Sequence, residues 1–179
     1  MKNRNSVVQF LLAFFILCSV SNFSFAQAAA DSSVKPLYSS VYDGNPNITF
    51  TQGSIIKLKS GQYYEILDKS NIKNMTANPT VNVYKDGKKL NLVIQNISTP
   101  IKAFLIKDVL ESTIDGDFKG WDGNTSWKLV NGDTWQQEFE NGNIYANLFR
   151  PAVTIMRVSD GTYKMMVKGI KEITTVKRK

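Results

Sequence analysis

An internal repeat is the feature of this sequence that most constrains its fold. Residues 55–64 and 126–135 share a Lys-Leu pair, a turn glycine, and an aromatic residue three positions after that glycine. Further matches follow the same order along the chain: 42–45 with 114–117, 79–83 with 151–155, and 85–87 with 159–161. Because chance similarity rarely preserves both order and spacing, the sequence predicts two copies of one unit.

Each copy has the pattern of short β-strands. Ile56 and Leu58 alternate with polar neighbours, as Trp127 and Leu129 do, which is the period of a half-buried strand. Asn-Gly, Ser-Gly and Asp-Gly pairs follow the strands and suit tight hairpin turns. A unit of about 70 residues with such strands is the size of a small antiparallel barrel. We therefore predict an all-β chain with two small antiparallel barrels in tandem, over residues 41–110 and 111–179.

The start of the chain predicts export. Lys2 and Arg4 precede an apolar run over residues 7–20, and small residues follow it, as in a secretory signal peptide. The run is shorter than the roughly 20 apolar residues that span a bilayer. We expect a signal peptide over residues 1–26, with cleavage after Ala26 or Ala28.

Removal of the signal leaves an exported chain. Its first part, residues 27–40, is expected to be a flexible segment, and no later apolar stretch is long enough to cross a membrane. The end of the signal resembles those of Gram-negative bacterial proteins, which favours the periplasm or the cell exterior. An exported protein is not expected to have nucleic acid as a partner, although the chain is basic.

Cysteine and histidine usage excludes several chemistries. The one cysteine, Cys18, lies inside the signal, so the mature chain would have no disulfide, thiolate nucleophile or cysteine–zinc site. The chain has no histidine, the commonest general base and metal ligand. We expect no cofactor.

One stretch of the second copy carries a resemblance. Residues 114–121 read Ile-Asp-Gly-Asp-Phe-Lys-Gly-Trp, and residues 128–137 read Lys-Leu-Val-Asn-Gly-Asp-Thr-Trp-Gln-Gln. This pattern resembles small exported bacterial proteins without an assigned activity, over about residues 112–179. The resemblance implies an SH3-like (Src-homology-3-like) barrel, which we expect for both tandem copies, and it supplies no catalytic residues to carry over. The first copy departs from it, with Tyr-Tyr-Glu at 63–65 in place of Trp-Gln-Gln.

Three aspartates crowd one glycine-rich loop and suggest a calcium site: Asp115, Asp117 and Asp122. The calcium-loop pattern needs an oxygen ligand at its fifth position and Glu at its twelfth. Lys119 and Ser126 stand there instead. We expect turn chemistry from these aspartates and no metal site, and the sequence leaves an irregular ion site open.

Clustered carboxylates suggest a second chemistry, glycoside hydrolysis. The candidates are Asp117, Asp122, Glu138 and Glu140. A small barrel offers little concave volume in which to bury a sugar and raise the pKa of an acid. We therefore expect no enzyme, and rank a carboxylate hydrolase below the non-enzymatic alternatives.

Aromatic residues of the second copy are the candidate binding residues. Trp127 and Trp135 are in phase with Leu129 and are expected in the core. Trp121 follows a glycine in an expected loop. Tyr145 and Phe149 lie in an expected long loop over residues 138–149, where small barrels often carry binding insertions. Flat rings in exposed loops bind peptides or stack on sugars.

The sequence thus favours a binding module that recognises a peptide, a protein or a cell-envelope glycan. The ligand-binding residues are expected to be Trp121, Tyr145 and Phe149. The alternative is a structural or assembly protein of the bacterial envelope, in which these aromatic residues are all buried. Ligand identity and oligomeric state are left open.

Removal of the signal gives a direct prediction for the exported protein. Its N-terminus should be Gln27 or Ala29, because small residues precede both positions. N-terminal sequencing and intact mass of the protein from a periplasmic or culture fraction will measure this. An N-terminus at Met1 in that fraction would contradict the prediction.

Overall fold

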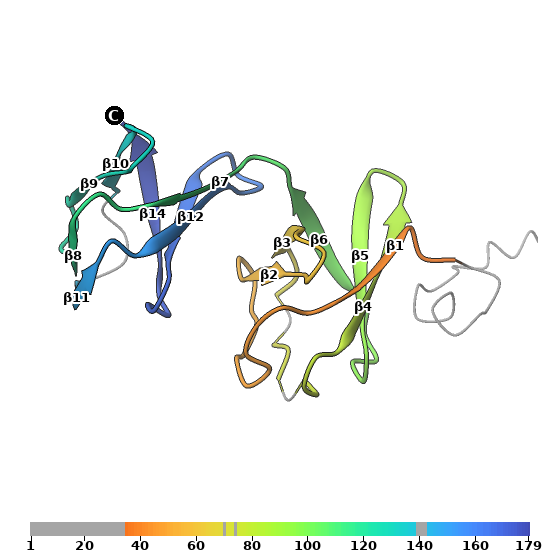
Figure 1. Cartoon of the computed structure of the whole chain (residues 1–179). Helices are drawn as coiled ribbons and strands as arrows, with labels where there is room; N and C mark the ends of the chain where they lie inside the picture. The colour runs from red at the N-terminus through yellow and green to blue at the C-terminus, as the bar shows by residue number, and fades with distance from the viewer. Residues whose placement is uncertain (1–34, 70, 74, 139–142) are drawn as a thin grey trace, which may run out of the picture.

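The structure, a computed structural model, describes residues 35–69, 71–73, 75–138 and 143–179. Every regular element within these ranges is a β-strand, and all pairings are antiparallel. Twelve of the fourteen strands in the described residues form two curled sheets that lie side by side, and the other two form a separate pair (Figure 1). This architecture confirms the predicted all-β class with two small barrels. The predicted signal peptide lies outside the described residues.

The first sheet has six strands in the order β1-β4-β5-β6-β3-β2. Its strands are β1 (Tyr38–Val41), β2 (Ile55–Lys57), β3 (Tyr63–Ile66), β4 (Thr80–Asp86), β5 (Lys89–Ile94) and β6 (Ile101–Ile106). Because β1 begins at Tyr38, the end of the expected flexible segment 27–40 belongs to this sheet.

The second sheet has six strands in the order β7-β12-β13-β14-β10-β9. Its strands are β7 (Val109–Thr113), β9 (Ser126–Lys128), β10 (Thr134–Gln137), β12 (Ala152–Arg157), β13 (Tyr163–Val167) and β14 (Ile173–Arg178). Strands that match in the sequence repeat hold the same place in the two sheet orders. Duplication of one ancestral unit would produce this arrangement. The duplication itself remains a prediction from the sequence.

Each sheet curls until its two edge strands meet at a single bridge. In the first sheet, Tyr42 after β1 pairs with Leu58 after β2. In the second, Ile114 after β7 pairs with Leu129 after β9. Two backbone hydrogen bonds of 2.8–2.9 Å flank each bridge. These contacts join the edge strands, which would otherwise expose unpaired backbone groups.

A glycine hairpin follows each bridge and sets the position of the next strand. Gly61 and Gly132 have φ angles of 93° and 92°, a region that favours glycine. Each glycine N–H donates to the carbonyl of the bridging leucine, Leu58 or Leu129. The leucines are fully buried, so the same residue both closes the barrel and fills its core.

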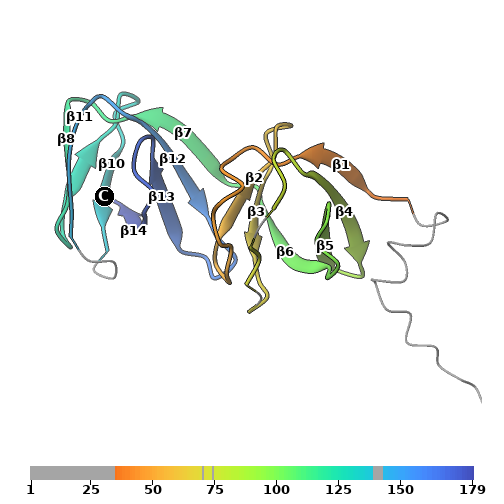
Figure 2. The same ribbon diagram turned by 90° about the horizontal axis from the view of Figure 1, so that it is seen from below.

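Two further strands lie outside the six-stranded sheet and cover the core of the second barrel. They are β8 (Asp117–Trp121) and β11 (Ile144–Phe149), which pair with each other as a two-stranded ribbon. In the first barrel, the described residues of the corresponding segments form a bridge between Phe50 and Ile72. The ribbon lies at the end of the second barrel that faces away from the first (Figures 1 and 2).

Each barrel has its own apolar core. Aliphatic residues dominate the first core, whereas the second contains a cluster of large aromatic side chains: Phe118, Trp121, Trp127 and Trp135. Phe118, Trp121 and Trp127 contact one another at ring-centroid distances of 5.9–6.3 Å. Such arrangements of aromatic rings are favourable beyond the area that they bury.

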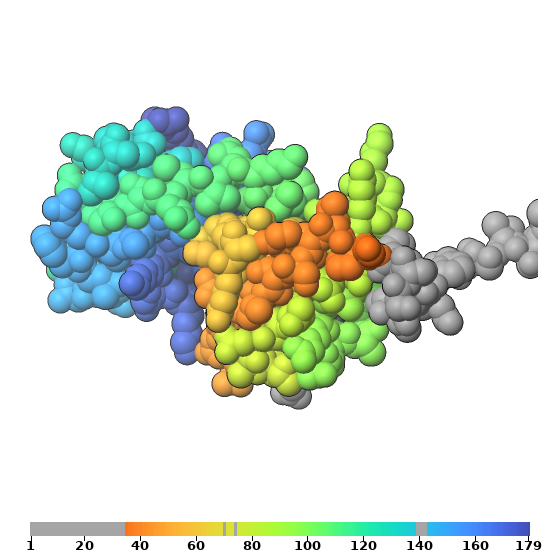
Figure 3. All heavy atoms as spheres, turned by 45° about the vertical axis from the view of Figure 1, so that its right-hand side comes forward, coloured from red at the N-terminus to blue at the C-terminus, as the bar shows by residue number. Residues whose placement is uncertain are grey.

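A third, smaller apolar cluster joins the barrels. Its buried members are Tyr63, Ile106, Met156 and Val158. The Tyr63 hydroxyl donates to the Glu111 carboxylate at 2.8 Å, across the junction. The backbone N–H of Ser159 donates to the Glu65 carboxylate of the other barrel at 2.7 Å. The space-filling view shows the two barrels in direct contact (Figure 3).

This junction predicts that the barrels unfold together. Leu58→Ala removes a fully buried side chain of the first barrel, which should lower the free energy of unfolding by about 2–5 kcal/mol. All three tryptophans lie in the second barrel and report on it. In urea, the variant should therefore shift the tryptophan-fluorescence midpoint as far as the circular-dichroism midpoint. Unchanged tryptophan fluorescence would mean that the barrels unfold independently, and Leu129→Ala serves as the positive control.

Candidate functional site

The ribbon of β8 and β11 contains the three residues that the sequence singled out. Tyr145 and Phe149 lie on β11 and are 88% and 75% exposed, the two most exposed large hydrophobic side chains among the described residues. In the corresponding segments of the first barrel, the described exposed hydrophobic residue is Ile48. The exposed aromatic pair therefore distinguishes the second barrel.

The expectation of a long loop is wrong for residues 144–149, which form β11. Their side chains alternate strictly between half-buried and exposed positions. The sequence of β11 is Ile-Tyr-Ala-Asn-Leu-Phe. Two of its three outward positions carry aromatic residues, so the sequence lacks the alternation of apolar and polar residues that is typical of a half-buried strand. The segment before it, residues 139–142, lies outside the described residues.

The expected loop position of Trp121 is also wrong. Trp121 lies on β8, is 2% exposed, and packs against Phe118 and Trp127. Its ring is therefore part of the core, and it does not form one exposed patch with Tyr145 and Phe149. Trp127 and Trp135 are each 4% exposed, which confirms their predicted burial.

A register shift explains why Trp121 is buried. Gly120 pairs with Tyr145 and Phe118 pairs with Leu148, so between these pairs one residue of β8 lies opposite two residues of β11. One strand must therefore lose its alternation of faces. Burial continues to alternate along β11, so the break occurs in β8 at Gly120, whose φ is 100°. The break turns Trp121 inward, opposite Ile144.

The outward face of the ribbon carries a polar row between its two aromatic rings. Lys119 on β8 donates a hydrogen bond of 2.7 Å to the side-chain oxygen of Asn147 on β11. The Lys119 ammonium also lies 3.3 Å from the carboxylate of Asp117, which pairs with Phe149. The face thus presents Tyr145, then a donor–acceptor row, then Phe149.

A hollow of about 420 Å³ adjoins this face. Trp121, Trp127 and Tyr145 line it together with the aspartates Asp117 and Asp122. The indole N–H of Trp121 is buried and has no hydrogen-bond partner among the described residues, so it is not one of the polar groups that the hollow exposes. Aromatic walls with a few polar groups are the usual composition of a ligand site.

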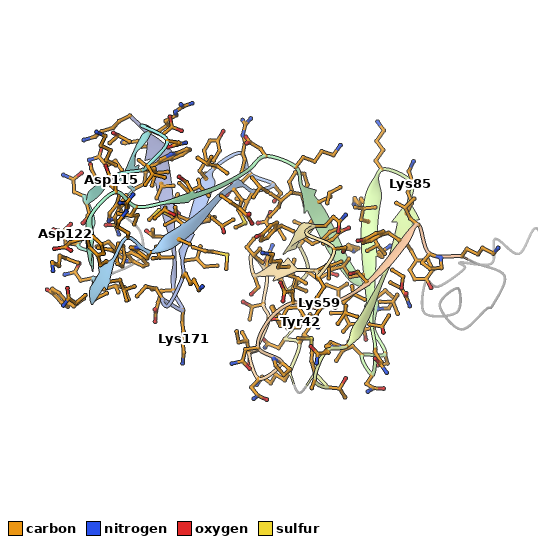
Figure 4. The ribbon with its side chains drawn as sticks, viewed as in Figure 1. Tyr42, Lys59, Lys85, Asp115, Asp122 and Lys171 are labelled. Carbon is orange, nitrogen blue, oxygen red and sulfur yellow. The ribbon has the colours of Figure 1, made fainter. Side chains whose placement is uncertain are left out.

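Asp122 is held in a rigid turn at the rim of this hollow, at the outer end of the second barrel (Figure 4). The Thr125 hydroxyl donates to its carboxylate at 2.6 Å, and the backbone N–H of Asn124 donates at 3.3 Å. These hydrogen bonds, that of Thr125 first, hold the pKa of Asp122 below its ordinary value. The carboxylate is therefore ionised and acts as an acceptor at neutral pH.

The other acidic candidates are engaged in separate ion pairs. Asp115 lies 3.9 Å from Arg150, and Glu138 lies 3.9 Å from Lys177. No group of three or more Cys, Asp or Glu side chains among the described residues is arranged to hold a metal ion. Glu140 lies outside the described residues.

A second hollow, which the sequence did not suggest, lies where the barrels meet. It has a volume of about 650 Å³, and its lining includes Lys57, Lys59, Lys107 and Glu111. Lys57 lies 3.7 Å from Glu111 and 5.1 Å from the centre of the Tyr63 ring. Its residues come from both barrels, so no pattern within one copy could have revealed it.

Comparison of the chain with protein-family models, curated proteins and solved structures gave no match. No helical segment capable of spanning a bilayer occurs in the part of the chain that the structure describes. The geometry of the ribbon therefore carries the functional argument.

The close approach at Gly120 predicts a specific sensitivity. A Cβ atom at this position would overlap the carbonyl oxygen of Ile144, so Gly120→Ala should separate β8 from β11. We expect a stability loss clearly above the roughly 1–3 kcal/mol of backbone strain alone, and increased acrylamide quenching of tryptophan fluorescence. Urea unfolding and quenching will measure both.

Gly116→Ala is the matched control. Gly116 has a φ of 108°, close to that of Gly120, but a Cβ atom there would meet no atom within 4 Å. This variant should lose stability through backbone strain, but acrylamide should quench its tryptophan fluorescence no more than that of the parent. Equal effects of the two substitutions would contradict the role of the close approach.

Proposed function

We propose that this protein is an exported, non-enzymatic binding module that recognises an extended peptide, protein segment or cell-envelope glycan. The observation that carries the proposal is the exposure of Tyr145 and Phe149 on one face of β11. The binding surface is this outward face, and Trp121 supports it from within the core.

The cost of this exposure supports a binding role. Removing a large hydrophobic side chain from water is worth about 1.5–3 kcal/mol, a gain that Tyr145 and Phe149 forgo in the free protein. The half-buried neighbours on β11, Ile144, Ala146 and Leu148, already pack against the core. The outward rings are therefore not needed to cover the core, and contact with a partner would recover the lost free energy.

The environment of the acidic residues favours binding over hydrolysis. A general acid needs a pKa raised towards the working pH. Hydrogen bonds lower the pKa of Asp122 instead, and Asp117 is exposed and pairs with Lys119. We infer that these carboxylates accept hydrogen bonds from a ligand and do not transfer protons to it.

One observation favours the structural alternative. Trp121, Trp127 and Trp135 are all buried, as expected of an assembly protein whose aromatic residues serve packing alone. Under this alternative, Tyr145 and Phe149 would contact a fixed protein neighbour in the envelope. The two candidate functions differ in the partner, and both use the outward face of the ribbon.

A binding assay with a double variant tests the proposal. Tyr145→Ala with Phe149→Ala should leave the free energy of unfolding within about 1 kcal/mol of the parent, because both rings are exposed. The same variant should lose retention on an immobilised envelope fraction that contains peptidoglycan, outer-membrane protein and surface polysaccharide. Cosedimentation will measure retention, and urea unfolding will measure stability.

Phe104→Ala is the control for general hydrophobic adhesion. Phe104 is 38% exposed and lies on β6 of the first barrel, away from the ribbon. This variant should be retained as well as the parent. Equal retention of the parent and the double variant would refute the proposal, as would a double variant that fails to fold.

A further inference from the structure

The outward face of the ribbon combines three chemical features that together define a class of ligand. They are two exposed aromatic rings, a row of hydrogen-bonding groups between them, and ion pairs that neutralise nearly all of the charged side chains. From their combination we infer that the ligand is an uncharged, hydroxyl-rich polysaccharide that lies along β11. This inference rests on the proposed binding function and names its ligand.

The aromatic residues match the apolar faces of sugar rings. Tyr145 and Phe149 are four residues apart on one face of β11, about 13 Å at the usual rise of a strand. Gly120 lies opposite Tyr145 and has no side chain, so it leaves one flank of the tyrosine ring open. The faces of a pyranose ring carry C–H groups, which stack on aromatic rings. A polysaccharide that lies along β11 can contact both Tyr145 and Phe149.

The polar row matches the hydroxyl groups at the edges of sugar rings. A hydroxyl group donates one hydrogen bond and accepts others, so it needs both kinds of partner side by side. Lys119 supplies donors, Asp117 supplies acceptors, and the amide of Asn147 supplies both. The three side chains already contact one another in the order Asp117, Lys119, Asn147.

These polar groups can change partners at little cost. The side chains of Lys119 and Asp117 are 66% and 59% exposed, and an exposed ion pair contributes only about 0–1 kcal/mol to stability. A ligand hydroxyl can therefore insert into the row without unfolding the ribbon. The row holds the donors and acceptors in place before the ligand arrives.

Charge compensation selects against charged partners. Lys119 pairs with Asp117, and Arg150 beyond Phe149 pairs with Asp115. Asp122 at the hollow is the remaining charged side chain among the described residues of 115–125 and 143–150. With one uncompensated negative charge, this face does not attract an anionic polymer, although the whole chain carries a formal net charge of +7.

The hollow beside Tyr145 extends the same chemistry. Thr125 and Ser126 add hydroxyl groups to its rim, and Asp122 adds an ionised acceptor. Trp121 lines the hollow with its ring, whereas its indole N–H is buried and does not face a ligand there. A sugar unit entering the hollow finds an aromatic wall and several hydrogen-bonding groups, which makes the hollow a subsite of the same face.

The test is a binding screen of the full chain on one array. The array carries neutral oligosaccharides of varied linkage, uronic-acid and phosphorylated oligosaccharides, and extended peptides of varied sequence. We expect neutral oligosaccharides to be bound, with affinity that changes little as salt is raised. Tyr145→Ala and Phe149→Ala should each weaken binding by about tenfold or more in titration calorimetry, whereas Phe104→Ala should leave it unchanged.

Asn147→Ala separates a glycan from a merely hydrophobic ligand. It removes hydrogen-bonding groups and leaves both rings, so a polysaccharide should bind several-fold more weakly. Peptide binding that depends on Tyr145 and Phe149, without glycan binding, would overturn this inference and keep the proposed function. Selective binding of acidic glycans would also overturn it, as would binding that is indifferent to Asn147. Binding to nothing on the array would overturn the inference, whereas the envelope-retention assay decides the proposed function separately.

Discussion

Closure of each barrel at a single bridge is the constraint on which the rest of the structure depends. Tyr42 with Leu58, and Ile114 with Leu129, join the edge strands of a six-stranded sheet. The bridging leucines are fully buried, so the contact that closes the backbone also anchors the core. Closure removes edges that would otherwise pair with other chains. The closed sheet still leaves part of each core uncovered, and further segments of each barrel cover that part.

The two barrels cover this part of the core differently, and the difference creates the candidate site. In the first barrel, the described residues of the covering segments pair at a bridge between Phe50 and Ile72. The second uses a ribbon of two strands, which buries Phe118 and Trp121 on its inner face. A strand has two faces, so a ribbon that covers a core with one face must present the other to solvent. On β11 that outer face carries Tyr145 and Phe149.

Much of the fold was predictable from local patterns. The period-two alternation around Leu58 and Leu129, and the turn glycines that follow them, predicted the strands and hairpins. The candidate site was less predictable. Tyr145 and Phe149 were identified from composition, but the strand that orders them was missed. Trp121 was expected to be exposed, because a local pattern contains no sign of the shift at Gly120 that turns it inward.

The amino-acid sequence is enough to predict the all-β class, the division into two units and the positions of the hairpins. The all-β class and the hairpins depend on side-chain periodicity and on backbone preferences, which act over a few residues, and the two units follow from the internal repeat. Packing in three dimensions sets which aromatic side chains are buried. It also brings Lys119 to Asn147, and Tyr63 to Glu111 across the junction. Such contacts join residues 28 and 48 positions apart, and their geometry depends on register and barrel closure, which no local pattern specifies.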